Sequence, residues 1–145
     1  MKLKYKQLPE LTTADIAYEI YGKNLNELFE NSALALFNTM CNLKKVKQKI
    51  KKIIKLKNEN SQDLLFDFIE ELIFLKDSKY ILFSKFKVKI KNNELQAECF
   101  GENINQAKHQ LKVDVKAITY HKFELKKMQG HKGSNPYIAR MVLDI

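Results

Sequence analysis

Residues that interrupt regular structure are scarce in this sequence. Its 145 residues include only four glycines and two prolines. These numbers are too small for a flexible linker or a low-complexity tract. The length is the commonest one for a single domain and is enough to bury one hydrophobic core without disulfides. We therefore expect one domain that spans residues 1–145.

Cysteines and long apolar runs are scarce as well. Cys41 and Cys99 are far apart and belong to no C-x-x-C pair, so we expect two buried, reduced thiols. No apolar run approaches the roughly 18 residues that cross a bilayer, and no charged-then-apolar signal peptide opens the chain. The sequence therefore predicts a cytoplasmic protein without a membrane partner.

Arginine is nearly absent from a strongly basic chain. The net charge is +9, yet Arg140 is the only arginine and every other cation is lysine. A basic surface attracts phosphate, but arginine supplies the planar fork that reads guanine and grips phosphate. Scattered lysines also argue against a dedicated binding face. The composition therefore favours a general electrostatic role near RNA over sequence-specific recognition.

The strong catalytic motifs are missing too. The chain has no G-x-S-x-G, H-E-x-x-H, Walker loop or dinucleotide fingerprint. The loop 130–136 holds Gly, Lys and Ser, but not in the order of a phosphate cradle. His109, His121 and His131 lack the spacing of a zinc pair. His121 falls in a predicted strand, where it either faces a functional surface or is a hydrogen-bonded structural histidine.

Two helices are predicted. Asn24 can cap the first, whose apolar residues from Leu25 to Met40 keep the spacing of a single face. Ser61 can cap the second, which runs to Leu75 and has only a narrow polar stripe. A helix this apolar is expected in the core, with a partner-facing position as the alternative.

The remaining segments read mainly as strands. We expect them at 2–6, 16–21, 46–56, 86–91, 95–100, 113–125 and 137–145, with an Asn92-Asn93 hairpin turn. Segment 46–56 also suits a helix, but its β-branched residues favour a strand. Strands and helices do not alternate strictly. The order predicts an α+β fold with a mixed, largely antiparallel β-sheet and two main helices packed on one side.

Two carboxylates stand where folding does not require them. Asp15 lies where a polar loop enters a strand, and Asp144 ends an apolar strand next to the terminal carboxylate of Ile145. If these strands are neighbours, three anionic groups converge, and such a cluster suits a hard divalent cation. The alternative is a solvated terminus and a loop-capping Asp.

Five segments together are similar to a known family. Residues 13–16 (TADI), 28–37 (LFENSALALF), 82–86 (LFSKF), 115–121 (VKAITYH) and 142–145 (VLDI) resemble the archease family, in order and over nearly the whole chain. The resemblance implies an accessory protein, not an enzyme. Such a protein activates the RtcB-type RNA ligase of tRNA splicing by promoting its guanylylation and multiple turnover, with RNA contacted only indirectly or weakly.

The resemblance also implies a site. It places a divalent metal ion, calcium by preference and magnesium or manganese as alternatives, at Asp15, Asp144 and Ile145. Lys116 and His121 match the family's Lys and His and are expected at a ligase-facing surface. Thr12 stands where the family usually has a His, which puts in question how Asp15 is oriented.

Two other functions stay open from the residues alone. The charge favours a non-enzymatic RNA-binding or chaperone-like module, which would bind RNA with a steep dependence on salt. The carboxylates in a basic protein favour a metal-dependent nuclease or hydrolase.

Overall fold

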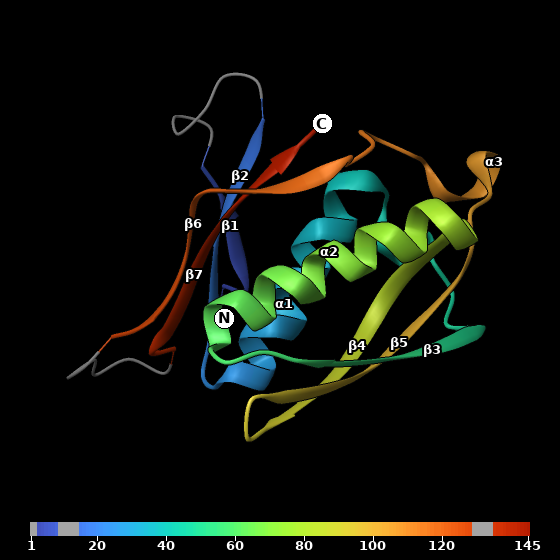
Figure 1. The fold of residues 1–145 in the computed structure, drawn as a ribbon. Coiled ribbons are helices and arrows are strands. Elements are labelled where there is room, and N and C mark those ends of the chain that lie inside the picture. The colour runs from blue at the N-terminus through green and yellow to red at the C-terminus, as the bar shows by residue number, and fades with distance from the viewer. Residues whose placement is uncertain (1–2, 9–14, 129–134) are drawn as a thin grey trace.

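The computed structural model describes residues 3–8, 15–128 and 135–145. Seven strands, two long helices and two short helical turns follow one another along these ranges (Figure 1). In chain order they are β1 (Tyr5–Gln7), β2 (Ile16–Gly22), α1 (Leu25–Met40), η1 (Leu43–Lys45), β3 (Ile50–Lys57), α2 (Ser61–Lys79), β4 (Ile81–Lys91), β5 (Glu94–Asn103), α3 (Gln106–His109), β6 (Ala117–Lys127) and β7 (Tyr137–Asp144).

The strands form two antiparallel sheets. One has the order β1-β2-β7-β6 and the other has the order β3-β5-β4. The expected α+β class with largely antiparallel strands is confirmed. The strands are divided between two sheets instead of joining in one, and Figure 1 shows α1 between them.

Helix α1 is buried on two sides, and this explains the division. One side carries the predicted apolar face, on which Phe37 packs at 5.6 Å from Phe83 of β4 between ring centroids. The other side carries small and polar residues that face β2. There Asn31 Nδ2 donates to the carbonyl oxygen of Tyr21 at 2.8 Å, and the hydroxyls of Tyr18 and Thr39 are 2.8 Å apart. A helix with two buried sides needs a sheet on each.

Helix α2 covers β6 and contacts α1. The rings of Phe68 on α2 and Phe29 on α1 stack with centroids 6.0 Å apart. Near the start of α2, Phe66 lies 5.5 Å from Phe123 of β6 between ring centroids. The Gln62 Oε1 atom accepts a hydrogen bond from the Leu125 N–H at 3.1 Å. The expectation that this helix belongs to the core is confirmed by its buried apolar residues.

The outer edge of β4 is joined to α1 by side chains. The N–H of Val88 donates to Glu30 Oε2, and the N–H of Ile90 donates to Asn26 Oδ1, both at 2.9 Å. At its far end β4 is connected to β5 by a turn at Asn92 and Asn93, whose φ values are 52° and 61°. Both lie in the left-handed region that a two-residue hairpin requires, as the sequence predicts.

Both cysteines are buried and unpaired, as expected. Burial raises the pKa of the Cys41 thiol to about 11 and that of the Cys99 thiol to about 12, so neither forms a reactive thiolate near neutral pH. Within the described ranges, neither long helix has the length and apolar character needed to pass through a membrane.

Candidate functional site

The strands that carry the two predicted carboxylates are neighbours. In the pairing of β2 with β7, Ile16 lies opposite Leu143. Asp15 immediately precedes that position on β2, and Asp144 immediately follows it on β7. Because the two strands run antiparallel, these residues lie at the same end of the sheet, where the C-terminus is marked in Figure 1. The condition that the sequence left open is therefore met.

A third strand brings Lys116 to the same end. Ala117 of β6 pairs with Asp144, and the N–H of Lys116 donates to the carbonyl oxygen of Asp144 at 2.8 Å. Asp144 and Lys116 are exposed, whereas Asp15 and Ile145 are half-buried. Ile145 also packs against the edge of the core. We call Asp15, Asp144 and Ile145 the acidic end of the sheet.

His121 lies elsewhere on β6. The regular pairing of β6 with β7 is interrupted between Thr119 and Glu124, and His121 falls inside this irregular stretch. Its side chain is exposed, and its N–H donates to the Thr119 hydroxyl at 3.3 Å. Among the described residues, no hydrogen bond or ion pair connects His121 with Asp15 or Asp144. Thr12 lies outside the described residues, as does most of the loop 130–136.

The acidic end offers only oxygen donors. Asp15 and Asp144 supply side-chain carboxylates, and the third predicted donor is a main-chain oxygen of Ile145. Across the part of the chain that is described, no three or more His, Cys, Asp or Glu side chains are grouped so that they could hold a metal ion. The predicted set contains two such side chains, so its metal-binding role stays a prediction. Oxygen-only donors are those that Ca²⁺, Mg²⁺ and Mn²⁺ accept.

A buried polar cluster elsewhere was not predicted. Glu102 on β5 accepts hydrogen bonds from the Lys47 N–H at 2.8 Å and from His109 Nε2 at 2.9 Å, and it pairs with the Lys108 ammonium at 2.7 Å. These donors, with the Lys108 contact the strongest, lower the pKa of the Glu102 carboxyl to about 2. His109 Nδ1 accepts from the Asn105 N–H at 2.9 Å, which leaves the proton of the neutral ring on Nε2.

This cluster is structural. His109 is fully buried and both of its ring nitrogens have protein partners, so it has no position left for a ligand. The short helix α3 depends on it, because Asn105 caps that helix and Glu102 holds its last residue against β5. The sequence offers one signal for this cluster, the helix-capping residue Asn105. Glu102 and His109 are seven positions apart and follow no recognisable motif, so their contact could not be predicted.

Comparison with known proteins gives one consistent result. Residues 5–145 match the sequence model of the archease protein family. The protein archease of Pyrococcus furiosus is 37% identical over 137 residues, and that of Sulfurisphaera tokodaii is 42% identical over 135 residues. Each alignment covers 92% of this chain and 94% of the relative.

A solved structure agrees with the sequence matches. The solution structure of Methanobacterium thermoautotrophicum protein 1598 superposes with a TM-score of 0.81 at 34% sequence identity. The superposition covers 98% of this chain and 99% of that one. The similarity therefore extends over both sheets and both long helices.

Proposed function

This chain belongs to the archease family, and from this membership we propose that it is an accessory protein that activates an RtcB-type RNA ligase of tRNA splicing. In this proposal it promotes guanylylation of the ligase and repeated turnover, and it does not itself join or cut RNA. The observation that carries the proposal is the family match from residue 5 to residue 145. Both predicted carboxylates lie within that match.

The arrangement of strands supports a metal-handling role for the acidic end. β2 and β7 could have lain in different sheets, and then Asp15 and Asp144 would have been separated. They are hydrogen-bonded neighbours instead, so two carboxylates stand at adjacent strand ends. Neither carboxylate has an ion-pair partner among the described residues. Two unneutralised carboxylates side by side repel each other, and a bound divalent cation would remove that repulsion.

The donors suit a divalent cation that is shared with a partner. Ca²⁺ takes six to eight oxygen ligands, and the two Asp side chains with a main-chain oxygen of Ile145 provide only part of that number. The remaining positions are available to water, to a nucleotide phosphate or to groups of the ligase. When bound, the ion would supply positive charge that attracts phosphate oxygens.

Lys116 is the neighbour best placed to assist. Its backbone is fixed to Asp144, so its exposed side chain starts from the same end of the sheet. We assign it to the ligase-facing surface next to the acidic end. His121 belongs to a separate part of β6, and we assign it to the periphery of that surface.

The test is multiple-turnover RNA ligation by a purified RtcB-type ligase with GTP and a divalent metal. The wild-type chain should raise the number of turnovers, and Asp15→Asn and Asp144→Asn should each abolish most of that increase. Glu124→Gln is the matched control, because Glu124 is a partly exposed carboxylate on β6 away from the acidic end, where it pairs with Lys126. Full activation by both Asp variants would disprove the role of the acidic end.

A parallel incubation tests the nuclease alternative. The chain alone, mixed with RNA and Mg²⁺ or Mn²⁺, should leave the RNA intact. Cleavage that is lost in Asp15→Asn would establish a metal-dependent nuclease and overturn the accessory role.

A further inference from the structure

The three-stranded sheet has two chemically different faces. Its inner face is apolar and buried, with Val88 of β4 and Ala97 and Cys99 of β5 in the core. Its outer face carries the alternate residues of each strand. Seven of these are exposed lysines, and we call the surface that they form the lysine face: Lys51, Lys55, Lys57, Lys85, Lys87, Lys89 and Lys91.

The register of the strands gathers these lysines into two rows. Lys51 of β3 and Lys85 of β4 both lie opposite Phe100 of β5, and Lys55 and Lys89 both lie opposite Gln96. The row on β3 and the row on β4 therefore flank the central strand β5. Alternate residues of a strand are about 6.6 Å apart and neighbouring strands about 4.8 Å apart. The two rows are thus separated by roughly 10 Å, with β5 as the floor between them.

Most of this charge is not neutralised. Glu98 pairs with Lys51 at 3.3 Å, and Glu94 pairs with Lys57 at 3.8 Å. The other five lysines of the lysine face form no ion pair with a carboxylate of the described chain. Like charges on neighbouring positions of a sheet are destabilising, so folding does not account for this arrangement. The lysine face thus concentrates about half of the net charge of the chain, and it attracts a polyanion.

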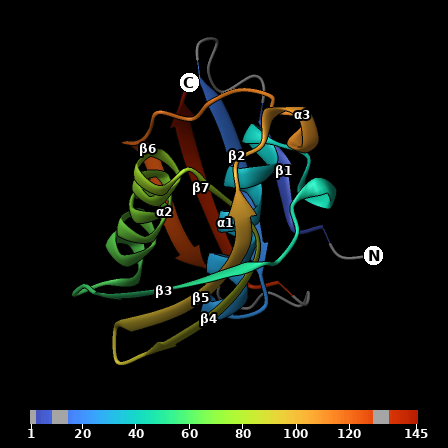
Figure 2. The same cartoon turned by 90° about the vertical axis from the view of Figure 1, so that its right-hand side faces the viewer.

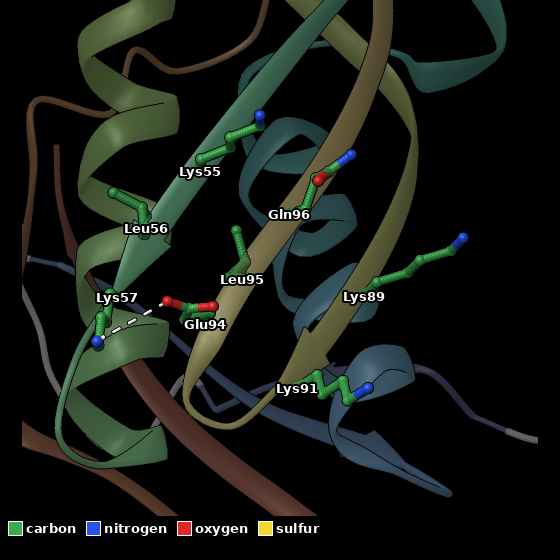
Figure 3. Close-up of a pocket in the computed structure, with 8 residues that line it drawn as sticks. All are labelled: Lys55, Leu56, Lys57, Lys89, Lys91, Glu94, Leu95 and Gln96. Carbon is green, nitrogen blue, oxygen red and sulfur yellow. Dashed lines mark ion pairs between the residues drawn. The ribbon is translucent and has the colours of Figure 1, made fainter.

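The floor between the rows provides an aromatic ring and a hollow. Phe100 is half-buried, and the ammonium groups of Lys85 and Lys87 both lie 5.8 Å from its ring centroid. Further along β5, a shallow hollow of about 590 Å³ is bordered by Lys55, Lys89 and Gln96 (Figure 3). Nothing else among the described helices and strands covers this side of the sheet in Figures 1 and 2.

We propose that the lysine face binds the sugar–phosphate backbone of single-stranded RNA, which would run along β5 between the two lysine rows. Cationic rows that follow the backbone, together with an aromatic ring on which a base can stack, are the features of single-strand binding surfaces. Lysines contact phosphates as point charges and do not read bases, so the binding is independent of sequence. The choice of RNA over DNA rests on the proposed function, whereas the affinity for a phosphate backbone rests on the lysine face alone.

An acidic protein is the competing partner, and two features of the lysine face disfavour it. Protein interfaces concentrate arginine and deplete lysine, and the lysine face contains no arginine. The row on β4 also has a lysine at every alternate position from Lys85 to Lys91, which suits the repeating charge of a nucleic acid strand, whereas exposed Ile53 interrupts the row on β3. A protein partner is therefore one of the outcomes that the experiment must detect.

The experiment measures binding of the full chain to a fluorescent single-stranded RNA of mixed sequence by anisotropy, without any ligase, from low to physiological salt. With five unpaired lysines in contact, the logarithm of the affinity should fall against the logarithm of the salt concentration with a slope of about −3.5. The double variant Lys87→Gln/Lys89→Gln should reduce that slope to about −2 and weaken binding at least tenfold at low salt. Phe100→Leu should weaken it about fivefold through lost stacking.

Lys79→Gln/Lys126→Gln is the matched control, because it removes the same charge at exposed lysines on α2 and β6. It should bind RNA within twofold of the wild type. An equal loss in this control would show that only overall charge matters and would overturn the proposal. Absence of RNA binding by the wild type at low salt would overturn it as well, as would a Lys87/Lys89 variant that keeps its RNA affinity but fails to activate the ligase.

The acidic end separates this proposal from the proposed function. Asp15→Asn should keep the RNA affinity of the wild type while it loses ligase activation. If Lys87→Gln/Lys89→Gln loses RNA binding but still activates the ligase, RNA binding by the lysine face is supported and is independent of ligase activation. Each proposal can therefore fail without the other.

Discussion

The Nε2 atom of His109 and the carboxylate of Glu102 form a buried hydrogen bond of 2.9 Å that ties α3 to β5. The pKa of the Glu102 carboxyl in the folded chain is about 2, below its ordinary value of 4.5. Between these two values the unfolded chain binds more protons than the folded one. The contribution of Glu102 to the free energy of unfolding is therefore complete above about pH 5 and is lost as the pH falls toward 2.

We expect Glu102→Gln to remove this dependence. Between pH 5 and pH 2.5 the wild type should lose more unfolding free energy than the variant, by on the order of 1 kcal/mol, because solvent screens the lysine contacts. Urea unfolding at several pH values measures the difference. Glu124→Gln, at a partly exposed carboxylate, should follow the wild type. If the unfolding free energies of the wild type and of Glu102→Gln change equally with pH, the lowered pKa of Glu102 is contradicted.

A calcium titration tests the acidic end directly. We expect the wild type to bind Ca²⁺ in isothermal calorimetry, and Asp15→Asn or Asp144→Asn to weaken that binding at least tenfold, because each removes one of few charged donors. Unchanged affinity in both variants would place any metal elsewhere.

The hydroxyl of Tyr120 on β6 donates a hydrogen bond to the carboxylate of Asp63 in the first turn of α2. This bond is the main reason why the pKa of the Asp63 carboxyl is lowered, and it raises the pKa of the Tyr120 hydroxyl. In Tyr120→Phe the pKa of Asp63 should rise toward its ordinary value, because the carboxylate loses that donor. NMR titration of the Asp side chains measures it. An Asp63 pKa that does not move would show that the bond is absent in solution.

Gly101 lies in the central strand β5, where the backbone of β4 comes close. A Cβ atom at this position would collide with the carbonyl oxygen of Leu82. Gly101→Ala should therefore lower the free energy of unfolding by about 2 to 3 kcal/mol, as overpacking a core does. Chemical denaturation measures it, with Gln96→Ala on the exposed side of the same strand as the control. A loss in Gly101→Ala no larger than in Gln96→Ala would show that β4 can move away.

Local signals predicted the elements well. Asn24 caps α1 as expected, and its side chain accepts from the Glu27 N–H at 2.8 Å. The second cap is Asn60 instead of Ser61, because Asn60 Oδ1 takes the Asp63 N–H at 2.8 Å. Either residue type can cap, so the position of this helix start could be predicted only to within one residue.

Irregularities that depend on distant residues were not predictable. The alternating pattern predicts a strand that starts at residue 86, but β4 begins five residues earlier, at Ile81. The first part of the strand was missed because a bulge between Phe83 and Lys85 interrupts the alternation. β6 begins later than expected, since the N–H groups of Lys112 and Val113 bond to carbonyl oxygens at the end of α1 and not to a strand.

Pairing between strands that are distant in the sequence also creates both candidate surfaces, the acidic end and the lysine face. Asp15 and Asp144 are 129 positions apart, and only the pairing of β2 with β7 makes them neighbours. The lysines of β3 and β4 seemed scattered in the sequence because β5, which lies between them in space, follows both along the chain. Alternation within a strand shows which residues share a face, but not which strand lies beside it.

The side chains of Asn26 and Glu30 on α1 occupy N–H groups at the outer edge of β4. The N–H groups of Val88 and Ile90 are therefore not available to pair with a strand of a second molecule. This part of the edge is thus a poor template for intermolecular β-structure, and the repulsion between lysines on the adjoining face acts in the same direction.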